Sequence, residues 1–370
     1  MEKKKILFGI TSLTLGGAER VLVDLANELC EKYEITIFTI YAKGELEKQL
    51  SPKVRLQSLY PISFAMLTKA QKHVFMPLKI WLRKKHIYQT KIKRDYDVEI
   101  AFLEGPITRL FSTENKETRK IAWVHNDISA VFGKGVKAKI KKWIDKKVYE
   151  KYQKIIFVSQ DNKKKFEKIY QIKNEKEVIY NYIKKELVKE KANQKVSIEF
   201  DKKTINILTV ARLVQQKAID RLIKIHSKLI KEGIEHKIYV IGEGPERQKL
   251  EKIIKEEKVE NSFILLGKKE NPYPYIKQAD YFALLSYYEG YPMVLLEARI
   301  LGKDIIITDT AARETLKNYS HGKVVKNEEK EILSALREII QKKKVKEEIK
   351  KEEYENEYIL EKVKEIIETA

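Results

Sequence analysis

The sequence has almost no cysteine and no long apolar run. Cys30 is the only cysteine among 370 residues, so no internal disulfide and no cysteine-rich metal site can form. No apolar stretch approaches the roughly 18 residues that a membrane-spanning helix needs. The hydrophobic content of 43% still indicates a globular protein, and the chain is long enough for two domains with sizeable cores.

The N-terminus imitates a secretory signal, because Met1-Glu-Lys-Lys-Lys precedes the apolar run 6–10. We expect no such signal, since the run soon meets Thr11, Ser12 and Thr14, and a helical pattern follows without a convincing cleavage site. The sequence therefore favours a cytoplasmic protein.

The charge balance favours basic residues. Lys and Arg number 75 against 54 Asp and Glu, a net charge of +21 that attracts nucleic acid, anionic membranes or phosphorylated substrates. A lysine-rich bias spread over solvated faces is the alternative. We expect no nucleic-acid partner, because the sequence shows neither a helix-turn-helix nor an aromatic-basic platform.

Strand and helix patterns alternate along most of the chain, which predicts an α/β protein with parallel sheets. In the first half, strands are expected at 6–10, 34–40, 98–102, 121–124, 155–158 and 178–180, with a helix at 18–30. In the second half, strands are expected at 205–210, 237–241, 263–266, 281–285 and 304–307, and helices at 220–231, 246–257, 273–278 and 292–301.

The polar, lysine-rich segment 183–203 predicts a linker between two domains. We place an N-terminal domain at 1–185, a C-terminal domain at 186–350, and a last helix at 351–370 that returns to the first domain. Two doubly wound domains would bind a ligand in a cleft at the carboxyl ends of their sheets.

Glu289 and Glu297 flank the predicted start of a helix. Gly290 and Pro292 mark a tight turn after strand 281–285, and Pro292 suits the first turn of the helix. One carboxylate is therefore expected in the strand-to-helix loop, and the other about one turn into the helix.

The first N–H groups of this helix, at Met293 and Val294, form a ready anion site. An anion site between two carboxylates suits a nucleotide-linked substrate. The spacing Glu-x7-Glu between a strand and a helix resembles the signature of family-four retaining glycosyltransferases, which have the GT-B fold of two Rossmann-like domains facing each other across a cleft.

The resemblance implies a retaining hexosyl-type glycosyltransferase that uses a nucleoside diphosphate sugar, with uridine as the default base and no metal or other cofactor. The acceptor would be a glycan or lipid-linked molecule in the synthesis of cell-surface polysaccharide or glycolipid. Glu297 would bind the ribose hydroxyls, and Glu289 would hold the hydroxyls of the donor sugar.

Arg212 and Lys217 follow strand 205–210 and could stabilise the leaving diphosphate. The family has glycines where this sequence has Ala211 and Ala218, which could shift the backbone. These departures keep an alternative open, a catalytically silent nucleotide-sugar-binding partner of another glycosyltransferase.

Three further segments match loops that contact the donor in the family. Gly16 and Gly17 permit positive φ and close backbone approach, although a plain tight turn is the alternative. Gly242 follows strand 237–241 as a turn residue, and Lys269 lies where the family packs the base.

His125 ends strand 121–124, where a lone histidine is either structural or turned toward a ligand. The resemblance places it near the transferred sugar. Asp95 and Asp97 imitate an Asp-x-Asp metal motif, but Asp97 directly precedes strand 98–102, so we interpret it as a strand-entry residue. We expect no metal site.

Two basic stretches that each contain a tryptophan, 64–94 and 134–154, resemble amphipathic helices that lie in the headgroup region of an anionic membrane. An ordinary packed helix with a solvated lysine face is the alternative. Both stretches lie in the acceptor half, which favours a lipid-linked acceptor and peripheral association with the inner face of the cell membrane. The residues concerned are Trp81, Arg83, Lys84, Lys85 and Trp143.

Overall fold

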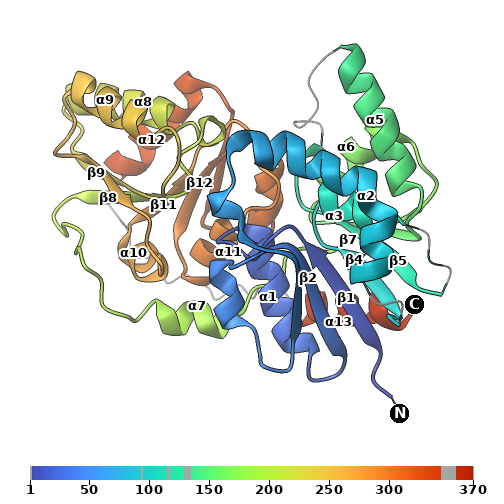
Figure 1. Cartoon of the computed structure of the whole chain (residues 1–370). Helices are drawn as coiled ribbons and strands as arrows, with labels where there is room; N and C mark the ends of the chain where they lie inside the picture. Colours follow the sequence, from blue (N-terminus) through green and yellow to red (C-terminus); the bar gives the residue numbers. More distant parts are fainter. Residues whose placement is uncertain are drawn as a thin grey trace. The chain divides into compact units, whose positions relative to one another are not determined.

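The computed structural model describes residues 2–92, 95–113, 115, 117–128, 135–342 and 356–369 (Figure 1). The chain divides into two compact units, each with its own sheet. Unit 1 comprises Met1–Ile183 and Glu355–Ala370, and unit 2 comprises Lys184–Tyr354. Within the described residues, no helix combines the length and apolar character that crossing a membrane requires.

Unit 1 is built on a seven-stranded parallel sheet in the order β3-β2-β1-β4-β5-β6-β7. Its strands are β1 (Lys5–Ile10), β2 (Glu34–Ala42), β3 (Arg55–Ser63), β4 (Val98–Ala101), β5 (Arg119–Val124), β6 (Lys154–Phe157) and β7 (Glu175–Val178). Its helices are α1 (Gly17–Leu29), α2 (Met76–Lys91), α3 (Pro106–Phe111), α5 (Val136–Tyr149), α6 (Gln160–Tyr170) and α13 (Asn356–Glu368), with short turns η1 (Glu45–Gln49), η2 (Phe64–Met66) and η3 (Gln71–Phe75).

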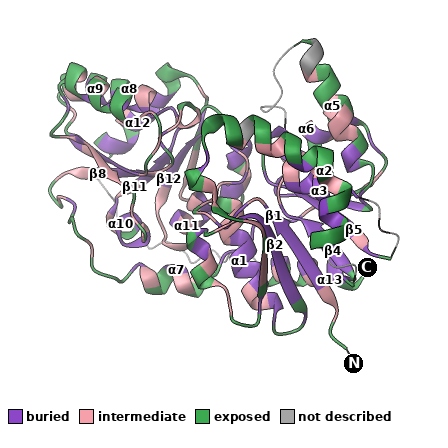
Figure 2. Ribbon diagram, in the orientation of Figure 1, coloured by how far each residue is buried: buried purple, intermediate pink, exposed green. Residues whose placement is uncertain are grey.

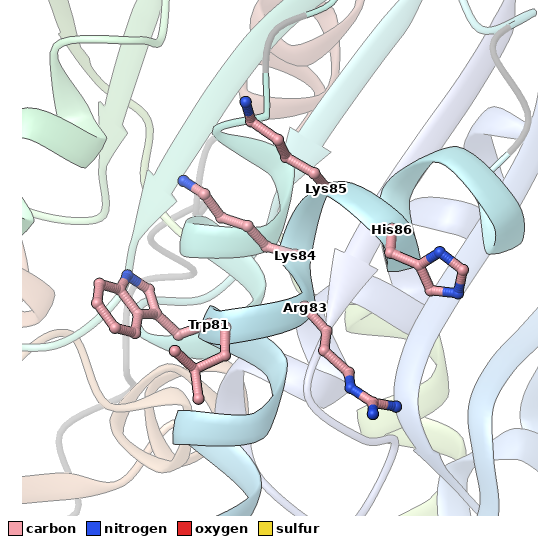
Figure 3. Close-up of a pocket in the computed structure, with 6 residues that line it drawn as sticks. Trp81, Arg83, Lys84, Lys85 and His86 are labelled. Carbon is pink, nitrogen blue, oxygen red and sulfur yellow. The ribbon is translucent and has the colours of Figure 1, made fainter.

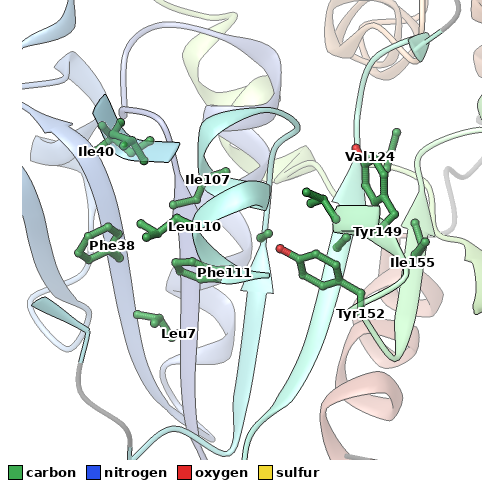
Figure 4. Close-up of a cluster of buried hydrophobic side chains, with 14 of the residues drawn as sticks. Leu7, Phe38, Ile40, Ile107, Leu110, Phe111, Val124, Tyr149, Tyr152 and Ile155 are labelled. Carbon is green, nitrogen blue, oxygen red and sulfur yellow. The ribbon is translucent and has the colours of Figure 1, made fainter. Parts of the chain in front are cut away.

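One face of this sheet packs on a cluster of apolar side chains from α2, α3, α5 and α6 (Figure 4). Leu7 and Phe38 come from strands, and Ile107 and Phe111 come from α3. Because strand residues alternate, Phe8 points to the other face. Right-handed crossovers on the two sides of β1 place α1 on the opposite face from α3. The strands are buried while the outer sides of the helices are exposed (Figure 2).

Unit 2 has a six-stranded parallel sheet in the order β10-β9-β8-β11-β12-β13. Helices α8, α9 and α12 cover the face that carries one buried cluster. Its strands are β8 (Ile205–Val210), β9 (His236–Ile241), β10 (Phe263–Gly267), β11 (Tyr281–Leu284), β12 (Asp304–Thr308) and β13 (Gly322–Val325). Its helices are α7 (Lys185–Lys191), α8 (Ile219–Lys231), α9 (Arg247–Glu257), α10 (Tyr273–Gln278), α11 (Met293–Ile300) and α12 (Glu329–Gln341), with turns η4 (Gln215–Lys217) and η5 (Ala311–Leu316).

The strand order reverses between β1 and β4 in unit 1, and between β8 and β11 in unit 2. At such a point the loops leaving the two central strands turn to opposite faces of the sheet, and a crevice opens beyond the carboxyl ends. In unit 2 these are the loop from β8 to α8 and the loop from β11 to α11.

The segment 183–203 is not the plain linker that its polar composition predicts. It contains α7, whose Val188 is buried together with Ala192. Asn271 fastens the end of α7, since its Nδ2 donates to the carbonyl of Lys191 at 2.8 Å. Two apolar residues were enough to bury this short helix, too few to show as a pattern.

The edge of the first sheet also departs from the sequence prediction. Strand β7 lies at Glu175–Val178, three residues before the expected position, and its apolar pattern is weak because Glu175 and Glu177 both pair with Lys154. Strand β3, at the edge of the first sheet, and strand β13 were not predicted from the sequence.

Candidate functional site

In unit 2, the loop leaving β8 and the loop leaving β11 are joined by hydrogen bonds. The amide of Tyr287 donates to the carbonyl of Gln216 at 2.9 Å. The side chain of Gln216 donates from Nε2 to the carbonyl of Tyr288 at 2.9 Å. The two loops at the switch point are therefore held side by side.

This junction brings together two of the residues predicted from sequence, Lys217 and Glu289. Lys217 Nζ lies 2.6 Å from Glu289 Oε1, and the two side chains are 14% and 6% exposed. A charge this well buried requires a partner, and each of these residues supplies it for the other. The guanidinium of Arg212, in the same β8–α8 loop, is exposed and has no side-chain partner among the described residues. It is thus free to bind an anion.

Ala218 has a backbone conformation that glycine adopts readily. Its φ of 51° and ψ of 37° are left-handed, and it is the N-cap residue of α8. For an L-residue with a Cβ this conformation costs about 1–2 kcal/mol. The loop therefore carries backbone strain at the position where the resembled family has glycine.

Gly242 and Gly244 allow the chain after β9 to pass very close to the β8–α8 loop. A Cβ on Gly242, whose φ is 149°, would lie 1.8 Å from the carbonyl oxygen of Ala211. A Cβ on Gly244 would lie 2.3 Å from the carbonyl oxygen of Leu213. These glycines are required by backbone packing that holds the loop of Arg212 in place.

Lys269, expected near the base, is half-buried after β10. Its Nζ lies 5.7 Å from the centroid of the Tyr275 ring and 3.5 Å from Ser197 Oγ. Its side chain is thus directed toward α10 and the segment after α7.

Helix α11 begins at Met293, one residue later than predicted, because Pro292 is its N-cap residue with an extended ψ of 123°. No side chain caps this end, so the N–H groups of Met293 and Val294 have no acceptor within the helix. Glu297 is the fifth residue of the helix and is half-buried; its Oε1 accepts a hydrogen bond from Tyr273 Oη at 3.2 Å.

In unit 1, His125 directly follows β5 and is only 9% exposed. Its ring lies 4.7 Å from that of Phe102 and 6.2 Å from that of Trp123, centroid to centroid. Burial lowers the pKa of His125 to about 3, so the imidazole is neutral at physiological pH. Its Nε2 is buried with no hydrogen-bond partner among the described residues. Such an atom is available to a polar group of a ligand.

Glu104, which the sequence reasoning missed, braces the backbone of this histidine. Its Oε1 accepts the backbone N–H groups of His125 at 2.5 Å and of Asn126 at 2.7 Å, and its Oε2 accepts from Asn126 Nδ2 at 3.0 Å. Burial raises the pKa of Glu104, and the N–H donors oppose that shift. Its place after β4, beside the switch point, was the signal available in the sequence.

Gly16 and Gly17 do not adopt positive φ, which corrects the sequence expectation. Gly16 is extended, with φ −146° and ψ 164°, and caps α1, whose first residue is Gly17. A Cβ on Gly16 would lie 2.2 Å from Glu19 Oε2. A side chain at position 16 would therefore displace the Glu19 carboxylate, which is the far end of a flexible side chain.

Asp97 forms hydrogen bonds with Lys5, the first residue of β1. Its carboxylate accepts the backbone N–H of Lys5 at 2.7 Å, and its own N–H donates to the carbonyl of Lys5 at 2.9 Å. Within the part of the chain that the structure describes, no three His, Cys, Asp or Glu side chains are grouped as metal ligands.

The basic residues of α2 do not share one side of the helix. Trp81 to His86 line a surface pocket, and Figure 3 shows Arg83 directed away from Lys84 and Lys85. Segment η3 and helix α2 together carry an exposed apolar stripe at spacings of three and four residues. The stripe consists of Val74, Phe75, Leu78, Trp81 and Leu82.

Trp81 is 41% exposed, and Trp143 on α5 is 63% exposed, next to exposed Ile140. Both helices also bury side chains in the core of unit 1, among them Ile80 of α2 and Val148 of α5, so each is a packed helix that carries large apolar side chains in solvent as well. An exposed apolar patch of this kind marks an interaction surface.

The two halves of the chain match models of two protein families. Residues 15–187 match Glycosyltransferase Family 4, and residues 190–356 match Glycosyl transferases group 1. Among solved structures, Anabaena HepE in complex with UDP and glucose has a TM-score of 0.69, with 17% identity over 92% of this chain and 90% of its own. TarM has a TM-score of 0.70 and 16% identity over 98% of both chains.

Among curated proteins, one relative is the N-acetylgalactosamine-N,N'-diacetylbacillosaminyl-diphospho-undecaprenol 4-alpha-N-acetylgalactosaminyltransferase of Campylobacter jejuni. It is 28% identical over 336 residues, which are 87% of this chain and 86% of the relative. An uncharacterized glycosyltransferase of Methanocaldococcus jannaschii is 25% identical over 80% of this chain and 73% of its own.

Two parallel-sheet Rossmann-like domains with these neighbours define the GT-B fold. The chain is a GT-B glycosyltransferase that joins a Family 4 first half to a group 1 second half.

Proposed function

We propose that this protein is a retaining glycosyltransferase that moves a hexose-type sugar from a nucleoside diphosphate sugar, with UDP as the nucleotide. The acceptor is a glycan or a lipid-linked glycan in the synthesis of cell-surface polysaccharide or glycolipid. The observation that carries the proposal is the contact between Lys217 and Glu289 beside exposed Arg212 at the switch point of unit 2. The Campylobacter relative, named for a diphospho-undecaprenol-linked substrate, supports a lipid-linked acceptor.

The chemistry of this junction suits a sugar diphosphate, in which two anionic phosphates adjoin a neutral polyol. Arg212 and Lys217 supply cations for the phosphates, and Glu289 supplies an acceptor for the sugar hydroxyls. Glu289 binds and orients the sugar, and we assign it no role as a hydrolase-type nucleophile.

The leaving diphosphate gains negative charge as the glycosidic bond breaks. Arg212, Lys217 and the N–H groups of Met293 and Val294 would stabilise that charge, each well-placed donor contributing about 3 kcal/mol. With these groups in place, the proposed transfer requires no metal ion. His125, neutral and unpartnered at Nε2, can hydrogen-bond a hydroxyl of the transferred sugar.

The remaining donor contacts follow the family resemblance. Glu297 accepts hydrogen bonds from the ribose diol, while Gly242 and Lys269 lie on the loops that face the nucleotide. Gly16 and Gly17 contribute the start of α1. No observation favours the catalytically silent partner.

Calorimetric titration with UDP, GDP and ADP, each with and without magnesium, tests the donor site. We expect micromolar binding of UDP that magnesium does not change. Absence of binding by all three nucleotides would overturn the roles of Arg212, Lys217 and Glu297. For the transfer reaction, NMR of the first-formed product should show the anomeric configuration of the donor, and the opposite configuration would exclude a retaining enzyme.

We further propose that α2 and α5 bind an anionic membrane surface peripherally, at the inner face of the cell membrane. The exposed stripe of η3 and α2 supplies apolar side chains, and Arg83, Lys84 and Lys85 supply charge around it. Such interfacial binding adds burial of apolar area to attraction by anionic lipid.

Flotation with vesicles of phosphatidylglycerol and phosphatidylcholine tests this surface. Replacing Phe75 and Leu82 with serine should abolish binding, and replacing Arg83, Lys84 and Lys85 with glutamine should weaken it. A matched control replaces three lysines of unit 2 with glutamine, which removes the same charge elsewhere. If control and α2 variants bind equally, the membrane proposal fails. The control lysines are Lys202, Lys252 and Lys255, all exposed.

A further inference from the structure

The loop leaving β11 is held through its backbone carbonyls by side chains from three other segments. Arg221 Nη2 donates to the carbonyl of Leu285 at 2.6 Å, and Thr308 Oγ1 donates to that of Ser286 at 2.6 Å. The next two carbonyls accept from Asn327 Nδ2, at 2.8 Å, and from Gln216 Nε2, at 2.9 Å. An irregular loop usually leaves such groups to water, whereas here each of the carbonyls of 285–288 has a protein donor.

Arg221 connects this loop to two other segments of the unit. It lies in the first turn of α8, three residues after Ala218. Besides its bond to Leu285, its Nη1 donates to Asn327 Oδ1 at 2.8 Å, and its guanidinium carbon lies 4.5 Å from the centroid of the Tyr287 ring. One planar side chain thus ties α8, the β11–α11 loop and the turn after β13 together.

Asn327 links Arg221 to two carbonyls of the loop. Its Oδ1 accepts from Arg221, and its Nδ2 donates to the carbonyls of Tyr287, at 2.8 Å, and Ser286, at 3.3 Å. The amide has one orientation that satisfies donors and acceptors alike. A change at Arg221 therefore reaches Ser286 and Tyr287, three and two residues before Glu289.

We propose that Arg221, acting partly through Asn327, is a positioning residue that fixes the Glu289 carboxylate and its partner Lys217 for sugar transfer. The inference rests on the proposed function of these two residues. Arg221 holds the loop that carries Glu289 on one side, and through the start of α8 it fixes the loop that carries Lys217 on the other.

Arg299 offers a matched comparison within the same unit. It donates to the carbonyls of Thr315 at 3.2 Å, Lys317 at 3.1 Å and Asn318 at 3.3 Å, and its guanidinium carbon lies 5.2 Å from the Tyr319 ring centroid. The chemistry equals that of Arg221, but the turn it holds carries no proposed site residue. Arg299→Lys therefore shows how much the loss of a guanidinium that stacks on a tyrosine ring and donates to carbonyls changes the measured properties in general.

The experiment compares Arg221→Lys, Asn327→Asp and Arg299→Lys in the full chain. Asn327→Asp keeps the acceptor for Arg221 and removes the donor to the loop. For each variant we would measure kcat and KM with the UDP-sugar that the wild type turns over, UDP affinity, and deuterium uptake of the peptide 285–292.

We expect Arg221→Lys and Asn327→Asp to lower kcat by about 10- to 100-fold, since a displacement on the order of 1 Å of a reacting-site group has effects of this size. UDP affinity should fall much less than kcat, because Arg212 and Glu297 are proposed to bind phosphate and ribose without help from Arg221, and uptake in 285–292 should rise. Arg299→Lys should leave kcat and that peptide unchanged.

A kcat for Arg221→Lys no lower than that for Arg299→Lys would overturn the inference, as would unchanged deuterium uptake. Loss of UDP affinity in parallel with kcat would show a general support role and would also overturn it. A wild type that turns over no nucleoside diphosphate sugar would overturn the proposed function and the catalytic part of the inference with it. The uptake comparison would then still decide whether Arg221 holds the loop.

Discussion

His226 and His236 form a buried chain of hydrogen bonds in unit 2 that requires a neutral His236 ring. His236 Nδ1 lies 2.9 Å from the carbonyl of Ile234 and must donate to it, which leaves its Nε2 as an acceptor. His226 Nδ1 donates to that nitrogen at 2.8 Å, and His226 Nε2 lies 2.8 Å from the hydroxyl of Ser262. A proton on His236 Nε2 would place two donors against each other.

Acidification should therefore destabilise unit 2. Burial lowers the pKa of His226 to about 3 and also lowers that of His236, while both have a pKa near 6.5 in the unfolded chain. Below that value the unfolded state binds more protons than the folded state, so stability falls as the pH falls, down to the folded pKa. Between pH 7 and pH 5, each histidine that stays neutral costs about 2 kcal/mol, because 1.36 kcal/mol is lost per pH unit. We expect a loss of roughly 2–4 kcal/mol for the pair.

Urea unfolding between pH 5 and pH 7, followed by circular dichroism and by tryptophan fluorescence, measures this loss. The three tryptophans, Trp81, Trp123 and Trp143, all lie in unit 1, so fluorescence follows unit 1 alone and the remaining dichroism transition reports unit 2. His226→Gln should remove about 2 kcal/mol of the pH dependence, whatever it costs at pH 7. His86→Gln, at an exposed site on α2, is the control and should leave the unit 2 transition unchanged.

Two results would refute the reasoning. One is a unit 2 transition whose free energy changes by less than about 0.5 kcal/mol between pH 7 and pH 5, against the linkage expected for two neutral buried rings. The other is an unchanged pH dependence in His226→Gln, which would show that other groups carry the acid sensitivity.

Further predictions concern the buried pair of unit 1 and the two carboxylates of the proposed donor site. The Glu99 carboxylate is fully buried and lies 2.6 Å from Lys120 Nζ. Lys120→Met leaves this carboxylate without its cation and should therefore destabilise unit 1 by about 3–5 kcal/mol in urea unfolding followed by tryptophan fluorescence. A loss of stability below about 1 kcal/mol would contradict a desolvated ion pair. Glu297→Ala should weaken UDP binding by roughly 1–3 kcal/mol through loss of the ribose contacts, and an unchanged dissociation constant would refute that role. Glu289→Gln should retain UDP binding and lose turnover, whereas full activity would remove Glu289 from the site.

The central strands could be predicted from the sequence because they are buried on both faces. Parallel strands such as β5 and β11 read as continuous apolar runs, and the structure places them where those runs lie. The edge strands could not be predicted in the same way. Strand β3 is half exposed along its length, and β7 is rich in charged residues that pair with Lys154 on β6.

The gathering of Lys217 and Glu289 was predictable for a topological reason. Both follow central strands of one parallel sheet, and the carboxyl ends of such strands lie on the same edge. Glu104 offered the signal of its place after β4, whereas Arg221 and Asn327 offered none. The partners of these three residues are backbone groups 21, 64 and 40 residues away in the sequence, and a backbone group has no residue type that a pattern could reveal.

In each unit, side chains hold the backbone of a loop that follows a central strand, but unit 1 uses an acidic acceptor and unit 2 uses donors. In unit 1 the loop after β5 presents N–H groups, and the Glu104 carboxylate accepts two of them. In unit 2 the loop after β11 presents carbonyls, and Arg221 and Asn327 donate to them. Whether a loop is held by an acceptor or by donors follows from which of its backbone groups, N–H or carbonyl, are unpaired where the strand ends.

This arrangement bears on how a donor would bind. A loop that folds only around its ligand loses conformational entropy at binding, which weakens affinity. Here the loops that carry His125 and Glu289 are fixed by protein side chains before any ligand arrives, so that entropy is lost during folding. Both braces lie outside the residues proposed to touch the sugar. Substitutions at them should therefore change the rate of transfer more than the affinity for the nucleotide, which separates positioning from binding in this enzyme.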